Sequence, residues 1–128
     1  MAELQKVLFV DDSEDMRSLV REILQDHFNT LFAANGFEAK VLLDKLYFDA
    51  LITDLNMPLL SGDDLISEIA KDNRHEKMLL ILQSDLFFLE RLFKEHKNVA
   101  ADRFCTKGEI LSHDYPIKLK SWIKIKAG

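Results

Sequence analysis

Short apolar runs alternate along the chain with segments whose apolar residues recur every three or four positions. A run of mostly apolar residues is typical of a buried strand, whereas recurrence at i, i+3, i+4 and i+7 is typical of one face of a helix. The strand-like runs lie at residues 7–10, 29–34, 50–53, 78–83 and 103–106. The pattern predicts five strands, each followed by a helical segment.

The first helical segment has the clearest spacing, and Ser13 precedes it as an N-cap. Its apolar residues are Met16, Leu19, Val20, Ile23 and Leu24. Three more helices are predicted at 37–46, 63–71 and 86–95, and Pro116 opens a fifth, since proline is favoured in a first turn. Apolar strands separated by helices indicate a parallel sheet covered on both faces. The predicted fold is a doubly wound α/β sandwich of five strands and five helices.

The composition fits one globular domain over residues 1–128, with no output domain expected in this chain. The chain has 128 residues, of which 48% are hydrophobic and 30% charged. A net charge of −5 argues against an extended nucleic-acid surface. The basic residues near the C-terminus are expected to form a solvated face; they are Lys118, Lys120, Lys124 and Lys126.

The N-terminal sequence bears on where the protein resides in the cell, and the context of the single cysteine bears on its reactivity. No signal-peptide pattern is present, and no apolar run approaches the roughly 20 residues that span a bilayer, so a cytoplasmic location is expected. Cys105 is the only cysteine and lies in an apolar strand context. It is therefore expected to be a buried, inert thiol.

Three aspartates follow two of the predicted strands. Asp11 and Asp12 come directly after the run at 7–10, and Asp54 closes the run at 50–53. Because α/β proteins bind ligands outside the carboxyl ends of their strands, these carboxylates are expected to share one pocket. Like charges in one pocket raise one another's pKa, and a divalent cation with oxygen ligands keeps them ionised. The sequence predicts an acidic Mg²⁺ site.

Two more polar residues follow the remaining strands at the same edge. Ser84 follows the fourth strand and Lys107 follows the fifth. Taken alone, an aspartate pair or a serine after a strand is usually a helix cap, and a lone lysine is usually a surface residue. Together these residues stand at the ends of four different strands of one sheet, which favours a functional site.

The chain resembles a response-regulator receiver domain of the chemotaxis type over nearly its whole length. The resemblance rests on Val10-Asp11-Asp12-Ser13, on Thr53-Asp54-Leu55-Asn56-Met57-Pro58-Leu59-Leu60-Ser61-Gly62, and on Ser84 and Lys107. Asp54 and Ser84 are 30 positions apart, and Ser84 and Lys107 are 23 apart, which also fits the family. The resemblance implies a flavodoxin-like sheet with strand order 2-1-3-4-5.

The resemblance implies a phosphorylation-dependent signalling switch in a two-component phosphorelay. Asp54 would accept a phosphoryl group from a histidine kinase or a histidine phosphotransfer protein and hold it as an aspartyl phosphate. Such a domain is a phosphoacceptor with self-catalysed phosphotransfer and autodephosphorylation, and not a turnover enzyme. Phosphoryl transfer depends mainly on positioning and charge neutralisation, which agrees with an acidic site that holds Mg²⁺.

The resemblance also assigns roles to the other residues at this edge. Asp12 and Asp54 would bind Mg²⁺ directly, Asp11 mainly through water, and Asn56 through its backbone carbonyl. The two residues that would contact the phosphoryl oxygens are Lys107 and Ser84, with Ser84 moving toward the group and pulling the following loop with it.

The resemblance places the output surface on the fourth helix, the fifth strand and the fifth helix. Phe104 stands at the position of an aromatic that rotates inward on activation; the alternative is a permanently buried phenylalanine. The fourth helix has more apolar area than one core face requires, and at least one of its aromatics is expected to be exposed. Its large apolar residues include Phe87, Phe88, Leu92 and Phe93. An exposed aromatic there would suit a protein target or a homodimer.

Three residues depart from the family pattern. Asp85 replaces a small residue, and it either repels the incoming phosphoryl group and slows labelling by small donors or turns outward to cap the fourth helix. Gly108 replaces a proline, which makes a cis peptide improbable and is expected to leave the Lys107 loop more mobile, with Glu109 able to compete for the lysine. Leu86 replaces a frequent polar residue and would prolong the phosphorylated state.

Two other functions stay open. One is a degenerate receiver that binds partners independently of phosphorylation, because Asp85 and Gly108 disable phosphotransfer. The other is a hydrolase with an acidic Mg²⁺ site, which would need a general acid-base residue nearby. The histidines are expected at the surface, away from the strand ends; they are His27, His75, His96 and His113. The sequence identifies neither the kinase nor the downstream target.

Overall fold

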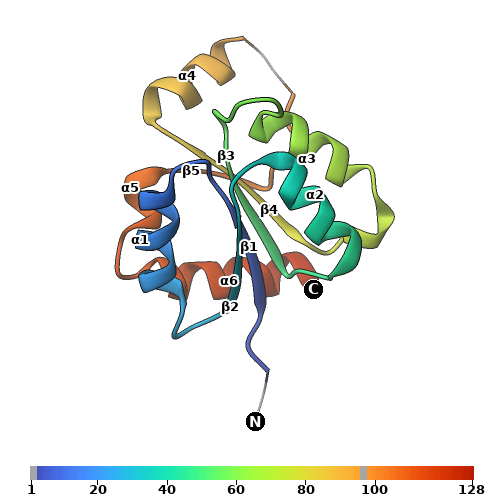
Figure 1. The fold of residues 1–128 in the computed structure, drawn as a ribbon, viewed down its shortest axis with the longest axis vertical. Coiled ribbons are helices and arrows are strands. Elements are labelled where there is room, and N and C mark those ends of the chain that lie inside the picture. The colour runs from blue at the N-terminus through green and yellow to red at the C-terminus, as the bar shows by residue number, and fades with distance from the viewer. Residues whose placement is uncertain (1–2, 96–97) are drawn as a thin grey trace.

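A five-stranded parallel sheet forms the centre of the molecule (Figure 1). The structure is a computed structural model that describes residues 3–95 and 98–128. The strand order is β2-β1-β3-β4-β5, as predicted. The strands are β1 (Lys6–Val10), β2 (Asn29–Ala33), β3 (Ala50–Asp54), β4 (Leu79–Ser84) and β5 (Arg103–Thr106).

All five predicted helices are present. They are α1 (Glu14–Leu24), α2 (Gly36–Lys45), α3 (Gly62–Ala70), α4 (Leu86–Lys94) and α6 (Tyr115–Ala127). The described residues also contain a short helix that was not predicted, α5 (Lys107–Ile110), and a 3-10 turn, η1 (Asn73–His75). A capping box starts α5, in which the Thr106 hydroxyl accepts from the Glu109 N–H and the Glu109 carboxylate accepts from the Thr106 N–H. Lys107 therefore lies in a capped helical turn and not in an open loop.

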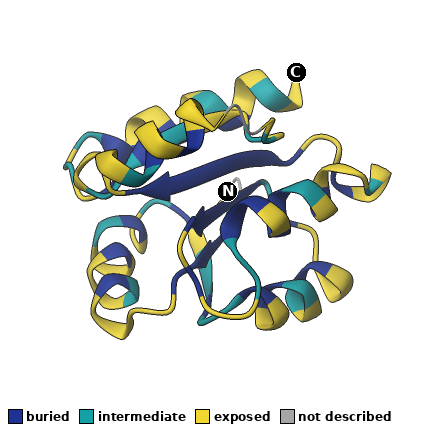
Figure 2. Ribbon diagram, turned by 90° about the horizontal axis from the view of Figure 1, so that it is seen from above, coloured by how far each residue is buried: buried dark blue, intermediate teal, exposed yellow. Residues whose placement is uncertain are grey.

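Helices cover both faces of the sheet, so the strands are buried between two layers (Figure 2). Alternate side chains of β1 separate the two cores: Leu8 and Val10 pack with residues of α2, α3 and α4, whereas Val7 and Phe9 pack with residues of α1 and α6. All four of these side chains are fully buried. Packing on both faces holds the strands in position, and the strands in turn set the positions of the residues that follow them.

The surface residues of the last helix agree with the prediction of a solvated basic face. Lys118, Lys120 and Lys124 are exposed, and Lys126 pairs with Asp102 at 2.9 Å. None of the described helices is both long enough and apolar enough to span a bilayer.

The prediction that the histidines lie at the surface was wrong for His75. This side chain is only 5% exposed, while His27 is half-buried and His113 is exposed. The turn η1 places His75 beside a small cavity of about 170 Å³ that Leu43 and Leu46 also line. His96 lies outside the described residues. A turn of three residues has no periodicity that would reveal its buried side.

Cys105 is buried, as predicted, and we expect it to react slowly. Its side chain is 2% exposed, and burial raises the pKa of the thiol to about 11. Because the thiolate is the reactive form, alkylation by iodoacetamide at pH 8 should be at least about 100-fold slower in the folded protein than in urea. A folded protein that reacts as fast as the unfolded one would contradict the buried position.

Candidate functional site

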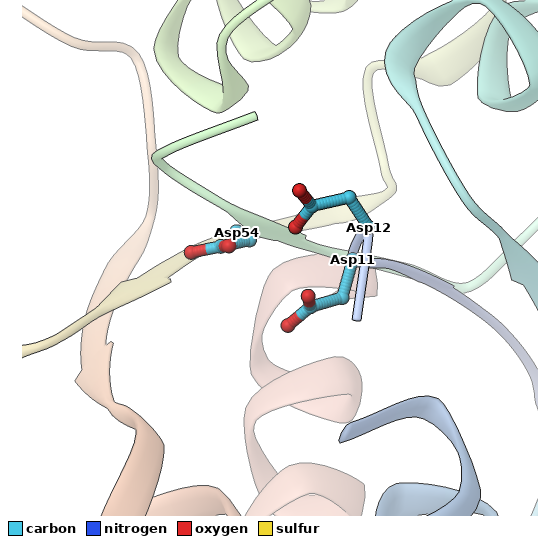
Figure 3. A group of neighbouring side chains, drawn as sticks. All are labelled: Asp11, Asp12 and Asp54. Carbon is cyan, nitrogen blue, oxygen red and sulfur yellow. The ribbon is translucent and has the colours of Figure 1, made fainter. Parts of the chain in front are cut away.

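The three predicted aspartates meet at the carboxyl edge of the sheet. Asp11 and Asp12 directly follow β1, and Asp54 is the last residue of β3. One carboxylate oxygen from each lies within 4.8 Å of the other two. Figure 3 shows the three side chains side by side at the ends of their strands. Asp11 and Asp54 are buried, whereas Asp12 is exposed, so the group is open to solvent on one side.

Asp11 is held in place by protein donors. Its Oδ1 accepts a hydrogen bond of 2.9 Å from the Ser13 N–H, and its Oδ2 accepts one of 3.1 Å from Nε2 of Gln83. The Arg17 guanidinium donates to the Asp11 backbone carbonyl at 2.7 Å. The pKa of Asp11 is nevertheless raised, above all by burial. Gln83 was not among the predicted site residues; the only signal in the sequence is an amide after an apolar run.

Asp54 is less fully satisfied than Asp11. Its Oδ1 is buried and has no hydrogen-bond partner within the described part of the chain, and its Oδ2 lies 3.8 Å from Nζ of Lys107. Burial, and then the charge of Asp11, raises the pKa of Asp54 to about 7, against the opposing charge of Lys107. The negative charge of Asp54 is therefore disfavoured in the metal-free site, and a bound cation would offset this.

The donor set fits Mg²⁺. This ion takes oxygen ligands at about 2.0 to 2.1 Å, so two oxygens on opposite sides of it are about 4 Å apart. The spacing of the three carboxylates is close to that range, and the unpartnered Oδ1 of Asp54 is a buried acceptor that a cation would satisfy. A cation would also offset the repulsion between Asp11 and Asp54.

The other predicted residues lie around this group. Ser84 is the last residue of β4, and its side chain is almost fully buried. The Asn56 side-chain amide donates to the Ser84 hydroxyl at 3.4 Å, and the Asn56 backbone N–H donates to Asp54. Lys107 reaches the group from the first turn of α5. The binding of a cation by the Asn56 carbonyl stays a prediction.

The comparison with known proteins agrees with this geometry. The sequence model of the response regulator receiver domain matches residues 7–109. The chain belongs to the response regulator receiver family. Receiver domains act in two-component signalling, where they interact with histidine kinases and downstream targets, and they generally bind Mg²⁺.

Several chemotaxis proteins are similar to this receiver. It is 40% identical over 80 residues to chemotaxis protein CheY-3 of Vibrio cholerae, and the match covers 59% of this chain and 62% of that protein. It is 33% identical over 104 residues to chemotaxis protein CheY of Halobacterium salinarum, covering 80% and 84%. Other matches lie in longer proteins: the receiver spans 29% of a response regulator receiver protein of Anaeromyxobacter and 8% of the sensor histidine kinase TmoS of Ectopseudomonas mendocina.

Solved structures show the same fold. The chemotaxis response regulator CheY4 of Vibrio cholerae superposes with a TM-score of 0.79 at 27% identity, covering 94% of this receiver and 98% of that chain. A response regulator receiver domain protein of Clostridium thermocellum gives a TM-score of 0.78 at 26% identity, covering 96% and 97%.

The Asp85 side chain, which departs from the family pattern, has the outward one of the two predicted orientations. Asp85 is exposed and stands at the N-cap position of α4, where its backbone carbonyl accepts from the N–H groups of Phe88 and Leu89. Its described side chain makes no capping hydrogen bond, so the predicted side-chain cap is wrong. The acidic group near Asp54 is formed by Asp11 and Asp12.

We expect Asp85→Ala to change phosphoryl labelling little. The Asp85 carboxylate is exposed, and exposed charges are strongly screened by solvent. The rate of labelling by acetyl phosphate, followed by phosphate-affinity electrophoresis, should stay within about twofold of the wild type at 0.15 M salt. A rate increase of tenfold or more in the Ala variant would contradict this expectation and favour the alternative in which Asp85 repels the phosphoryl donor.

The residues after β5 also correct one sequence prediction. The described residues contain no cis peptide, in agreement with Gly108 replacing proline. The Glu109 carboxylate accepts hydrogen bonds from the Thr106 N–H and hydroxyl, at 3.3 and 3.1 Å. It is therefore engaged in capping α5, while Lys107 faces Asp54, so the expected competition for Lys107 is not what the structure shows.

Aromatic residues are exposed on the predicted output surface. Phe87 is 66% and Phe93 51% exposed, which confirms the expectation of at least one exposed aromatic on α4, whereas Leu92 is buried. Phe104 is half-buried, and its ring meets that of Phe93 edge to face at 5.1 Å. A fully buried Phe104 is therefore excluded in this conformation. Leu86 is also exposed.

Proposed function

We propose that this receiver is a phosphorylation-dependent switch in which Asp54 is the phosphoryl acceptor. The donor would be a phosphohistidine on a histidine kinase or a phosphotransfer protein. The observation that carries the proposal is the position of Asp54. Its carboxylate lies beside those of Asp11 and Asp12, its Oδ2 is 3.8 Å from Nζ of Lys107, and its buried Oδ1 has no partner within the described part of the chain.

The chemistry needs a carboxylate, positive charge and a leaving group. An oxygen of Asp54 forms a bond to phosphorus as the bond between phosphorus and the histidine nitrogen breaks, and the imidazole leaves with the electron pair. The product is an aspartyl phosphate, which water later cleaves, so Asp54 is regenerated by autodephosphorylation. The domain is thus an acceptor that catalyses its own reaction, not a turnover enzyme.

The surrounding side chains lower the cost of bringing a phosphoryl dianion to a carboxylate. Mg²⁺, bound by Asp12, Asp54 and the Asn56 carbonyl and through water by Asp11, would supply positive charge to the phosphoryl oxygens. Lys107 already faces Asp54 and would donate to one of these oxygens. Ser84, the last residue of β4, would donate to another.

The output follows from a shift of Ser84. To reach a phosphoryl oxygen, Ser84 gives up its long contact with the Asn56 amide and draws the start of α4 with it. The apolar surface of α4, β5 and α6 then changes its shape, with Phe104 and its neighbour Phe93 repacking. A downstream protein, or a second copy of the receiver, would bind this surface in the phosphorylated state. In this proposal the partners are proteins, and the receiver neither binds nucleic acid directly nor inserts into a membrane.

The alternative is an interaction module that does not respond to phosphorylation. The exposed Phe87 and Phe93 favour it as a second candidate, because these aromatics are accessible before any phosphorylation. Beryllofluoride, a phosphoryl mimic, separates the two. With Mg²⁺ and beryllofluoride, the switch predicts changes in the amide NMR signals of Ser84 and of α4. Changes confined to the residues next to Asp54 would favour the constitutive module.

A further inference from the structure

A buried glutamine supports the acidic group from the neighbouring strand. Gln83 lies in β4, next to Asp54 on β3 in the sheet register, and its side chain is fully buried. The preceding residues of β4, from Leu79 to Leu82, are all apolar and buried. A buried amide after such an apolar run is costly unless its polar atoms are paired, so this residue needs an explanation.

Among the described residues the Gln83 amide is only half satisfied, with Asp11 as the partner of its nitrogen. Nε2 of Gln83 donates to Oδ2 of Asp11 at 3.1 Å, in a bond that is fully buried. The Gln83 Oε1 is buried as well and has no partner among the described residues. An unpaired buried acceptor of this kind costs about 1 to 3 kcal/mol. An apolar residue would avoid that cost, so folding alone does not account for Gln83.

The bond to Gln83 completes the orientation of Asp11. The other oxygen of Asp11 accepts from the Ser13 N–H, so both carboxylate oxygens are fixed by protein donors. Asp54, in contrast, has one oxygen without a partner in the described structure. This difference agrees with different roles for the two carboxylates. Asp54 has a free oxygen that can bind the cation directly, whereas Asp11 has oriented lone pairs that can accept hydrogen bonds from water bound to the cation.

We propose that Gln83 is a positioning residue that orients the Asp11 carboxylate and so strengthens the binding of Mg²⁺. The proposal rests on the acidic metal site of the proposed function. Side chains that hold metal-binding carboxylates in place usually contribute about 10- to 100-fold to metal affinity. Loss of the amide would leave Asp11 free to rotate while its charge, and its repulsion of Asp54, remain.

The test is the affinity of the metal-free protein for Mg²⁺, measured by isothermal titration calorimetry. Gln83→Met keeps the size of the side chain but removes the donor, and Gln83→Asn keeps the amide but shortens it by one methylene. Both variants should raise the Kd for Mg²⁺ about tenfold. Their stability in the absence of Mg²⁺, measured by urea unfolding, separates a change in metal binding from a change in folding, and the Asn variant carries the test if the Met variant does not fold.

Ile81→Met is the matched control, because Ile81 lies two residues earlier on the same face of β4 and is fully buried in the same core. It should bind Mg²⁺ within about twofold of the wild type. Wild-type affinity in both Gln83 variants would overturn the proposal, and so would an equal loss in the Ile81 variant, which would indicate a general effect on β4. A wild-type protein that does not bind Mg²⁺ would instead overturn the metal site itself.

Discussion

Replacing Gly62 with alanine is expected to lower the free energy of unfolding by about 3 kcal/mol and to abolish phosphoryl labelling. A Cβ atom on Gly62 would lie 2.0 Å from the backbone carbonyl oxygen of Asp54 and 2.8 Å from its carbonyl carbon. These atoms belong to the backbone, so they cannot move aside without moving Asp54. The Gly62 N–H also donates to the Leu55 carbonyl at 3.0 Å, which ties the start of α3 to the residue after the acceptor.

Gly108→Ala is the matched control for Gly62→Ala. The nearest atom to a Cβ at position 108 is the Thr106 hydroxyl at 4.0 Å, so the methyl group fits without a clash. Since alanine is favoured over glycine in a helix, this variant should be up to about 1 kcal/mol more stable than the wild type. Urea unfolding followed by circular dichroism measures both variants. Equal stability of the two would contradict the close approach of Gly62 to Asp54.

Asp54→Asn should stabilise the metal-free protein at pH 8 by about 2 to 4 kcal/mol, since one pKa unit corresponds to about 1.4 kcal/mol. Burial and the charge of Asp11 raise the pKa of Asp54 in the folded state to about 7, from an ordinary value of 3.8. Between these pH values the folded state binds more protons than the unfolded state, so stability falls as pH rises from about 4 to 7. Asparagine has a similar shape without the charge.

The pH dependence distinguishes this effect from a general change in packing. The stability difference between Asp54→Asn and the wild type in EDTA should be fully present above pH 7 and nearly absent by pH 4. Urea unfolding at several pH values measures it. A difference that does not vary with pH, or an Asn variant no more stable than the wild type at pH 8, would show that the ionised Asp54 carboxylate does not destabilise the metal-free protein.

The parts of the fold that were predictable are those set by long, regular patterns. The strand ends that deliver Asp11, Asp54 and Ser84 follow from apolar runs, because a parallel sheet brings the carboxyl ends of its strands to one edge. The receiver motifs then gave the likeness to a known family, which the comparisons confirm.

The parts that were not predictable depend on short segments or on contacts between strands. Helix α5 has four residues, too few for a periodic pattern, and is set by the capping box of Thr106 and Glu109. The burial of His75 depends on how one turn packs. The bond from Gln83 to Asp11 joins residues 72 positions apart, and the outward position of Asp85 is a choice of side-chain direction. The Thr106-x-x-Glu109 spacing is a local signal for α5, whereas the burial of His75, the bond from Gln83 to Asp11 and the direction of Asp85 are not encoded by local sequence spacing.

The role of Asp54 as phosphoryl acceptor is tested most directly by phosphate-affinity electrophoresis of the purified receiver after incubation with acetyl phosphate and Mg²⁺, with Asp54→Asn alongside. We expect a retarded band for the wild type that needs Mg²⁺ and is absent from the Asn variant. A wild-type protein that is folded and binds Mg²⁺ but gives no retarded band, or an Asn variant that gives the same band, would contradict the assignment of Asp54 as the phosphoryl acceptor.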